Sequence, residues 1–244
     1  LKKLDKADII LFGELHNNPI AHWLQLEVAQ DLQAGHELII GMEMLERDNQ
    51  DGINRYLAGE IEREQLDTLV RLWSNFETDY EPIIDFAKAN DLPVIATNIP
   101  RRYANLVYRK GFEALESLSE QEKEWIAPLP IAYDAELPGY KKMLEMMPGH
   151  GGENLPKAQA IKDATMAHSI LENYETGSTF LHLNGAYHSD NYEGILWYLQ
   201  RSQPQLSYFT VTTILQENIG KLKEEHKGKA DFIICVPANM TTTY

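Results

Sequence analysis

The 244-residue chain is short of cysteine and of positive charge, and each shortage excludes a class of protein. Its one cysteine, Cys235, leaves no disulfide framework and no cysteine-based metal site. Lysine and arginine total 22 against 37 aspartate and glutamate residues, giving a formal net charge of -15. Because nucleic-acid affinity rests largely on basic side chains, this balance argues against a nucleic-acid partner. No apolar run approaches the roughly 20 residues of a membrane span.

Apolar runs alternate with helical segments, which predicts an α/β fold with a largely parallel sheet flanked by helices. Buried strands are expected at 8–12, 36–43, 92–98, 179–185, 206–215 and 231–236. Helices are expected at 19–33, 139–147, 155–174, 190–200 and, in a charged segment, 218–227. Prolines and a glycine-rich knot indicate a helical excursion over 119–152. We expect one domain over residues 1–244.

Two short segments resemble each other at the ends of predicted strands. Gly-Glu-Leu-His occupies 13–16 and Gly-Ala-Tyr-His occupies 185–188. Ligands of parallel sheets bind at the carboxyl ends of the strands, so these exits should lie side by side and share a pocket. Glu43 is expected to leave a neighbouring strand in the same direction.

The predicted pocket therefore gathers four polar residues: Glu14, His16, Glu43 and His188. Two histidines and two carboxylates could bind a divalent metal, or could act as acid and base. Each residue alone could equally cap a helix or bond to backbone. Their arrival at one edge favours a site.

Asp163 lies out of place on the apolar face of the predicted helix 155–174, which it shares with Met166 and Ile170. A buried carboxylate without a partner is costly. Arg101 or Arg102, after a strand end, could supply the partner. We interpret this pair as structural support of the pocket wall rather than as catalytic.

The excursion carries methionines at helical spacing beside aromatic residues and a histidine: Met143, Met146, Met147, Tyr133, Tyr140 and His150. Such methionines are usually core filler, or part of an oligomer interface. They could also line a flat hydrophobic ligand. A ferric haem suits this lining, because a tyrosine phenolate is a hard anionic ligand for Fe(III).

Several motifs follow one another in a fixed order along nearly the whole chain: Gly-Glu-Leu-His-Asn-Asn-Pro at 13–19 with His22 and Gln25, Gly-Met-Glu-Met at 41–44 with Gln50, Tyr80, Ala-Thr-Asn-Ile-Pro-Arg at 96–101, Asp-Ala-Thr-Met-Ala at 163–167 and Gly-Ala-Tyr-His at 185–188. This order resembles the ChaN-like family of iron-regulated, haem-binding bacterial uptake proteins. That family is related to the Tiki proteases and the erythromycin esterases.

The resemblance implies a haem-binding protein of iron acquisition rather than an enzyme. It implies an exported, lipid-anchored chain of the periplasm or outer membrane, and the start at Leu1 rather than methionine is expected where a leader has been removed. Haem would lie at the interface of a homodimer, and an outer-membrane haem receptor is an expected partner. Tyr140 is the first candidate for the iron and Tyr133 the second, with His150, Met143 and Met147 around the cofactor.

The related hydrolases imply an alternative function in the strand-end pocket. A metal-dependent hydrolase would use Glu14, His16, Glu43 and His188, with an activated water as nucleophile. A third possibility is a binding protein for another flat hydrophobic ligand.

Overall fold

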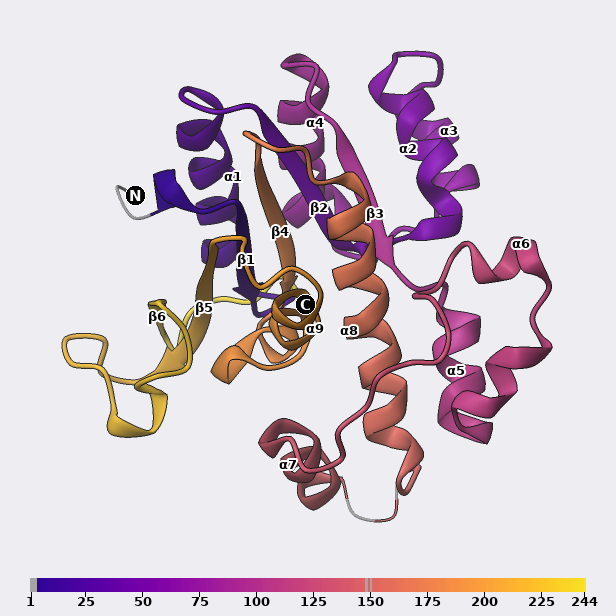
Figure 1. The fold of residues 1–244 in the computed structure, drawn as a ribbon. Coiled ribbons are helices and arrows are strands. Elements are labelled where there is room, and N and C mark those ends of the chain that lie inside the picture. Colours follow the sequence, from indigo (N-terminus) through magenta and orange to yellow (C-terminus); the bar gives the residue numbers. More distant parts are fainter. Residues whose placement is uncertain (1–3, 148, 150) are drawn as a thin grey trace.

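The computed structural model describes residues 4–147, 149 and 151–244 (Figure 1). Within them one six-stranded sheet contains β1 (Ile9–Glu14), β2 (Leu38–Glu46), β3 (Val94–Asn98), β4 (Thr179–Gly185), β5 (Tyr208–Gln216) and β6 (Phe232–Pro237). The order is β3-β2-β4-β1-β5-β6, and all neighbours are parallel. The predicted α/β class with a parallel sheet is confirmed.

The late strand β4 lies between β1 and β2. Glu14 pairs in register with Gly185 of β4, and Ile40 of β2 pairs with Leu181 on its other side. Glu43 leaves its strand in the predicted direction, but β2 neighbours β4 rather than β1, and that part of the prediction is wrong. The two Gly-x-x-His exits do lie side by side, because they end the adjacent strands β1 and β4.

Helices cover both faces of the sheet, as predicted (Figure 1). One face packs against α1 (Pro19–Gln33), α4 (Glu81–Ala89), α2 (Gln50–Leu57) and α3 (Arg63–Leu69), and the other against α8 (Asn154–Asn173) and α9 (Ile195–Ser202). Alternation along β1 explains this division, because Ile10 and Phe12 face the first layer and Ile9 and Leu11 the second. Burial on both faces accounts for the unbroken apolar runs of the strands.

Between β3 and α8 the chain first forms α5 (Arg101–Lys110). The predicted excursion, 119–152, then contains two short helices, α6 (Glu120–Lys123) and α7 (Pro138–Met146). In Figure 1, α7 lies near the amino-terminal end of α8. None of the helices in the described part of the chain is long and apolar enough to cross a membrane.

Two predicted helices differ from the structure. The segment near 218–227 forms only a short 3-10 helix, Glu224–His226. The side chain of Gln216 donates a hydrogen bond to the carbonyl of Lys221 at 2.8 Å. This side-chain bond competes with the backbone bond that the same carbonyl would accept in a helix. The helix expected from 190 begins only at Ile195, because Asn191 and Gly194 have φ values of 60° and 56°.

Candidate functional site

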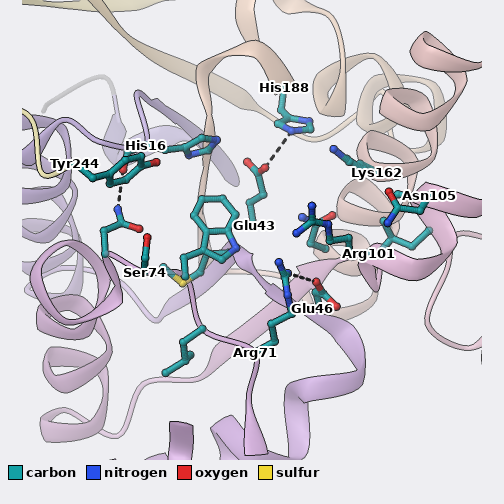
Figure 2. Close-up of a pocket in the computed structure, with 17 residues that line it drawn as sticks. His16, Glu43, Glu46, Arg71, Ser74, Arg101, Asn105, Lys162, His188 and Tyr244 are labelled. Atoms are coloured by element: carbon teal, nitrogen blue, oxygen red, sulfur yellow. Dashed lines mark hydrogen bonds and ion pairs between the residues drawn. The ribbon is translucent and has the colours of Figure 1, made fainter. Parts of the chain in front are cut away.

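A cavity of about 650 Å³ lies at the carboxyl ends of the strands. Its lining includes His16 after β1, Glu43 in β2, Asn98 in β3 and His188 after β4 (Figure 2). From the adjacent strands β1 and β4, the chain continues into α1 on one face and α9 on the other. Diverging connections of this kind leave a crevice in α/β sheets. The structure thus brings three of the four predicted pocket residues to one cavity.

His188 lies between two buried carboxylates. Its Nε2 is 3.1 Å from Oε1 of Glu43, and its Nδ1 contacts Oδ1 of Asp163. The exposed fractions of Glu43, Asp163 and His188 are only 6%, 1% and 6%. The predicted partners of Asp163 are therefore wrong, since His188 fills that place and Arg102 pairs with Asp48.

These contacts determine the charge of His188. Burial alone would lower the pKa of His188, but the Glu43 and Asp163 carboxylates outweigh it and raise the pKa to about 10. Burial raises the pKa of Asp163, whereas the charge of His188 holds the pKa of Glu43 well below its usual range despite burial. His188 is therefore an imidazolium at neutral pH, with both ring nitrogens donating to carboxylates.

Glu14 is not among the lining residues of the cavity, but it contacts His16, which is. Its Oε1 is 3.0 Å from Nδ1 of His16 and accepts a hydrogen bond of 2.5 Å from Tyr80, while Oε2 accepts one of 2.6 Å from Gln25. Burial opposes ionisation of Glu14, but His16 and His22 lower the pKa of this carboxyl. Burial would lower the pKa of His16, and Glu14 and Glu43 raise it instead. With Nδ1 held by Glu14, Nε2 of His16 remains for the cavity.

Gly185 is needed for space rather than for its backbone conformation. Its φ of -58° is open to any residue. A Cβ at this position would lie 2.7 Å from Cε1 and 2.8 Å from Nε2 of His16. Its N–H also donates to Oε2 of Glu43 at 2.6 Å. The second Gly-x-x-His segment thus positions the histidine of the first.

The fold divides the four predicted metal ligands into two pairs, Glu14 with His16 and Glu43 with His188. Within residues 4–147, 149 and 151–244, no group of three or more histidine, cysteine, aspartate or glutamate side chains could hold a metal ion. The predicted divalent-metal site is therefore not found in this structure. The oxygens that it needs are already bonded to Tyr80, Gln25 and the Gly185 N–H.

Several site residues received no role from sequence reasoning. Tyr80 ends a short π-helix, Phe76–Tyr80, and π-helical turns occur frequently at functional sites. Asn75 donates to the carbonyl of His16 at 2.8 Å, and Trp73 packs edge-on against the His16 ring at 4.8 Å between centroids. Tyr80 belongs to the ordered motifs of the sequence, whereas the sequence signal for Trp73 and Asn75 is a break in the helical pattern near residues 73–75.

The predicted haem ligand Tyr140 points inward. It is 4% exposed, and its ring stacks on Tyr133 at 5.4 Å between centroids. Its hydroxyl is buried and has no hydrogen-bond partner among the described residues. Burial and the Asp163 carboxylate raise the pKa of the Tyr140 phenol. Both effects oppose a phenolate at this position in the described conformation.

Two methionines at the carboxyl end of α7 are exposed. Met146 is 60% exposed and Met147, the next residue, is 44% exposed, whereas Met143 is half-buried. His150 lies outside the described residues. Tyr187 is 40% exposed, and its hydroxyl donates to the carbonyl of Gly139 at 2.7 Å. Its ring is therefore partly open to solvent beside α7.

Comparison with known proteins gives one family match, described as haem-binding uptake, Tiki superfamily, ChaN, over residues 1–199. A structure of ChaN of Campylobacter jejuni with cofacial haem binding has a TM-score of 0.69 at 19% identity, covering 95% of this chain and 88% of that chain. An erythromycin esterase mutant in its open conformation has a TM-score of 0.51 at 9% identity, and the match covers 93% of this chain and 75% of that chain. At these identities the structures show a shared fold alone.

A curated relative, protein RETICULATA-RELATED 5, chloroplastic, of Arabidopsis thaliana, is 26% identical over 135 residues. The match covers 52% of this chain and 18% of that protein, so this chain is similar to a small part of it.

Proposed function

Because the chain belongs to the ChaN family of haem-binding uptake proteins in the Tiki superfamily, we propose that it binds haem in bacterial iron acquisition. The family match over residues 1–199 carries this proposal, and the similar fold of Campylobacter jejuni ChaN supports it. The proposal extends to an exported, lipid-anchored protein of the periplasm or outer membrane that exchanges haem with an outer-membrane receptor.

The outer surface of α7 has the properties that a haem needs. Met146 and Met147 offer exposed apolar contact, and Tyr187 offers a phenol at the other end of the helix. These three residues would hold the cofactor, whose iron supplies the Lewis acid that a phenolate ligates. Burial, Glu193 and Asp163 raise the pKa of Tyr187, so ligation at this oxygen must displace a firmly held proton. The surface of one copy covers one face of a flat macrocycle, so a second copy on the other face accounts for a homodimer on haem binding.

Haemin titration followed by absorbance, with size-exclusion chromatography before and after, tests this function. We expect a saturable ferric tyrosinate spectrum and a shift towards dimer. Tyr187→Phe should abolish the phenolate charge-transfer band and weaken haemin binding at least tenfold, because it removes an axial ligand. Tyr140→Phe is the matched control and should retain the band. A wild-type protein without a specific spectrum would overturn the proposal, and loss of the band only in Tyr140→Phe would move the ligand to Tyr140.

Hydrolysis is a second candidate function, favoured by the pairing of His16 with Glu14. A general base needs one ring nitrogen held by an acceptor and the other directed at substrate, which is the arrangement of His16 over the cavity. Nε2 of His16 would take the proton of a water that attacks an ester or amide carbonyl.

Hydrolysis of p-nitrophenyl acetate tests this candidate. We expect His16→Asn and Glu14→Gln to lower the rate roughly 100-fold, the lower range for loss of general-base catalysis. His36→Asn, outside the cavity lining, is the control and should leave the rate unchanged. The rate should rise with pH through a pKa above 6.5, because Glu14 and Glu43 raise the pKa of the base His16. Equal rates in wild type and His16→Asn would remove the candidate.

A further inference from the structure

Two basic side chains in the cavity wall have no carboxylate partner within the described part of the chain. Arg101, the first residue of α5, and Lys162 of α8 both line the cavity, and Figure 2 shows them on the wall opposite His16. Among the side chains that the structure describes, neither lies within ion-pair distance of a carboxylate, whereas the other arginine of the lining, Arg71, is 2.5 Å from Glu46. Uncompensated basic residues facing one cavity are notable in a chain with a net charge of -15.

Each glutamate side chain in the cavity lining already contacts a cationic side chain. Glu43 faces the imidazolium of His188 at 3.1 Å, and Glu46 faces Arg71. Arg101 and Lys162 have no such contact among the described residues, and they lie on α5 and α8. A small anion entering the cavity would gain the attraction of Arg101 and Lys162 without meeting an unpaired glutamate side chain in the lining.

Two further features of this wall point to a ligand. α5 begins at Arg101 with Pro100 as its N-cap and has no acidic residue in its first turn, so its amino-terminal dipole favours an anion. Asn98, at the end of β3, also lines the cavity, and its Oδ1 is buried with no partner in the described part of the chain. A buried acceptor of this kind normally receives a hydrogen bond, and a ligand hydroxyl or amine would donate it.

We propose that this cavity binds a small acid whose carboxylate or phosphate lies between Arg101 and Lys162 and whose hydroxyl or amino group bonds to Asn98. The volume of about 650 Å³ is in the range of small-molecule sites. A ligand held by Arg101 and Lys162 would extend towards His16 on the opposite wall. That this ligand is a substrate rests on the hydrolase candidate. The anionic group could belong to a free metabolite-sized acid or to a haem propionate.

Calorimetry with inorganic phosphate and with L-malate tests the subsite. Because a hydrogen bond to a charged group changes affinity roughly 10- to 100-fold, Arg101→Gln and Lys162→Gln should each weaken binding at least tenfold. The matched controls are Arg102→Gln, whose arginine pairs with Asp48, and Lys157→Gln on the same helix as Lys162, and both should stay within twofold. Succinate, which lacks the malate hydroxyl, should bind more weakly than malate. Failure of both probes to bind, or equal losses in the controls, would overturn the proposal.

Haemin and its dimethyl ester distinguish the two sources of the anion. A loss of haemin affinity in Arg101→Gln that the dimethyl ester does not show would assign the subsite to a propionate. Unchanged haemin binding, with weakened malate binding, would assign it to a free acid. Calorimetry requires no turnover, so a protein that binds malate but does not cleave p-nitrophenyl acetate would keep the subsite and lose only the hydrolase function.

Discussion

Replacement of His188 by alanine is expected to lower the free energy of unfolding by about 3 to 5 kcal/mol, the usual cost of removing one partner from a buried ion pair. The histidine is the charged partner of both Glu43 and Asp163, which are 6% and 1% exposed. His188→Ala would leave both carboxylates buried next to the hole left by the ring. The loss corresponds to a fall of roughly 10 °C in Tm for a chain of this length.

The surface pair of His168 with Glu172, at 3.2 Å on α8, supplies a matched control for thermal or urea unfolding. His168→Ala should change stability by less than about 1 kcal/mol, because the two side chains are 28% and 45% exposed and pairs open to solvent contribute little. Adding Asp163→Asn to His188→Ala should restore part of the loss, since it removes one of the stranded charges. A His188→Ala protein as stable as His168→Ala would show that the buried network carries no such energy.

Asp163 connects the two regions in which function is proposed. It contacts Nδ1 of His188 at the strand-end cavity, and its charge also raises the pKa of Tyr140 and of Tyr187 beside α7. Any change in the charge of this carboxylate therefore acts on both regions. Haem binding at α7 and ligand binding in the cavity are expected to be sensitive to each other through this one residue.

The location of the site could be predicted from sequence because strand ends are a local signal. Ile9–Phe12 and Thr179–Leu183 are apolar runs that stop at glycine, and parallel strands place such stops at one edge. The insertion of β4 between β1 and β2 is not local. Consecutive strands usually lie next to each other, and nothing in the residues of β2 reports that a strand about 140 residues later will intervene.

The partners within the site were harder to predict for the same reason. A buried carboxylate at 163 reveals that a partner exists, but its identity depends on which strand end faces α8. From sequence, arginine was the expected partner because its positive charge complements a carboxylate. In the structure His188 is the residue that contacts Asp163. Tyr140 is a second example. Helical spacing places it near the methionines but does not tell which side of α7 faces the protein, and in the structure Tyr140 is buried whereas Met146 is exposed.

Stability is expected to fall as pH rises from about 6.5, the unperturbed pKa of histidine, towards 10. Glu43 and Asp163 raise the pKa of His188 to about 10 in the folded protein, so its contribution is fully present below 6.5 and is lost as the folded imidazolium deprotonates. The difference between the unfolded and folded pKa of His188 corresponds to at most about 5 kcal/mol of folding stability, at about 1.36 kcal/mol per pKa unit. His16 acts in the same direction, because its pKa is also raised.

Urea unfolding between pH 6.5 and 9.5 measures this effect below the ordinary pKa of tyrosine, whose buried members would otherwise add their own dependence. His188→Gln should flatten most of the decline, whereas His168→Gln should not, since burial lowers the pKa of His168. Imidazole ring signals in NMR provide a second measurement that does not require the variant to fold. They should show His188 still protonated at pH 9, and a neutral ring at that pH would show that the two carboxylates do not hold the proton.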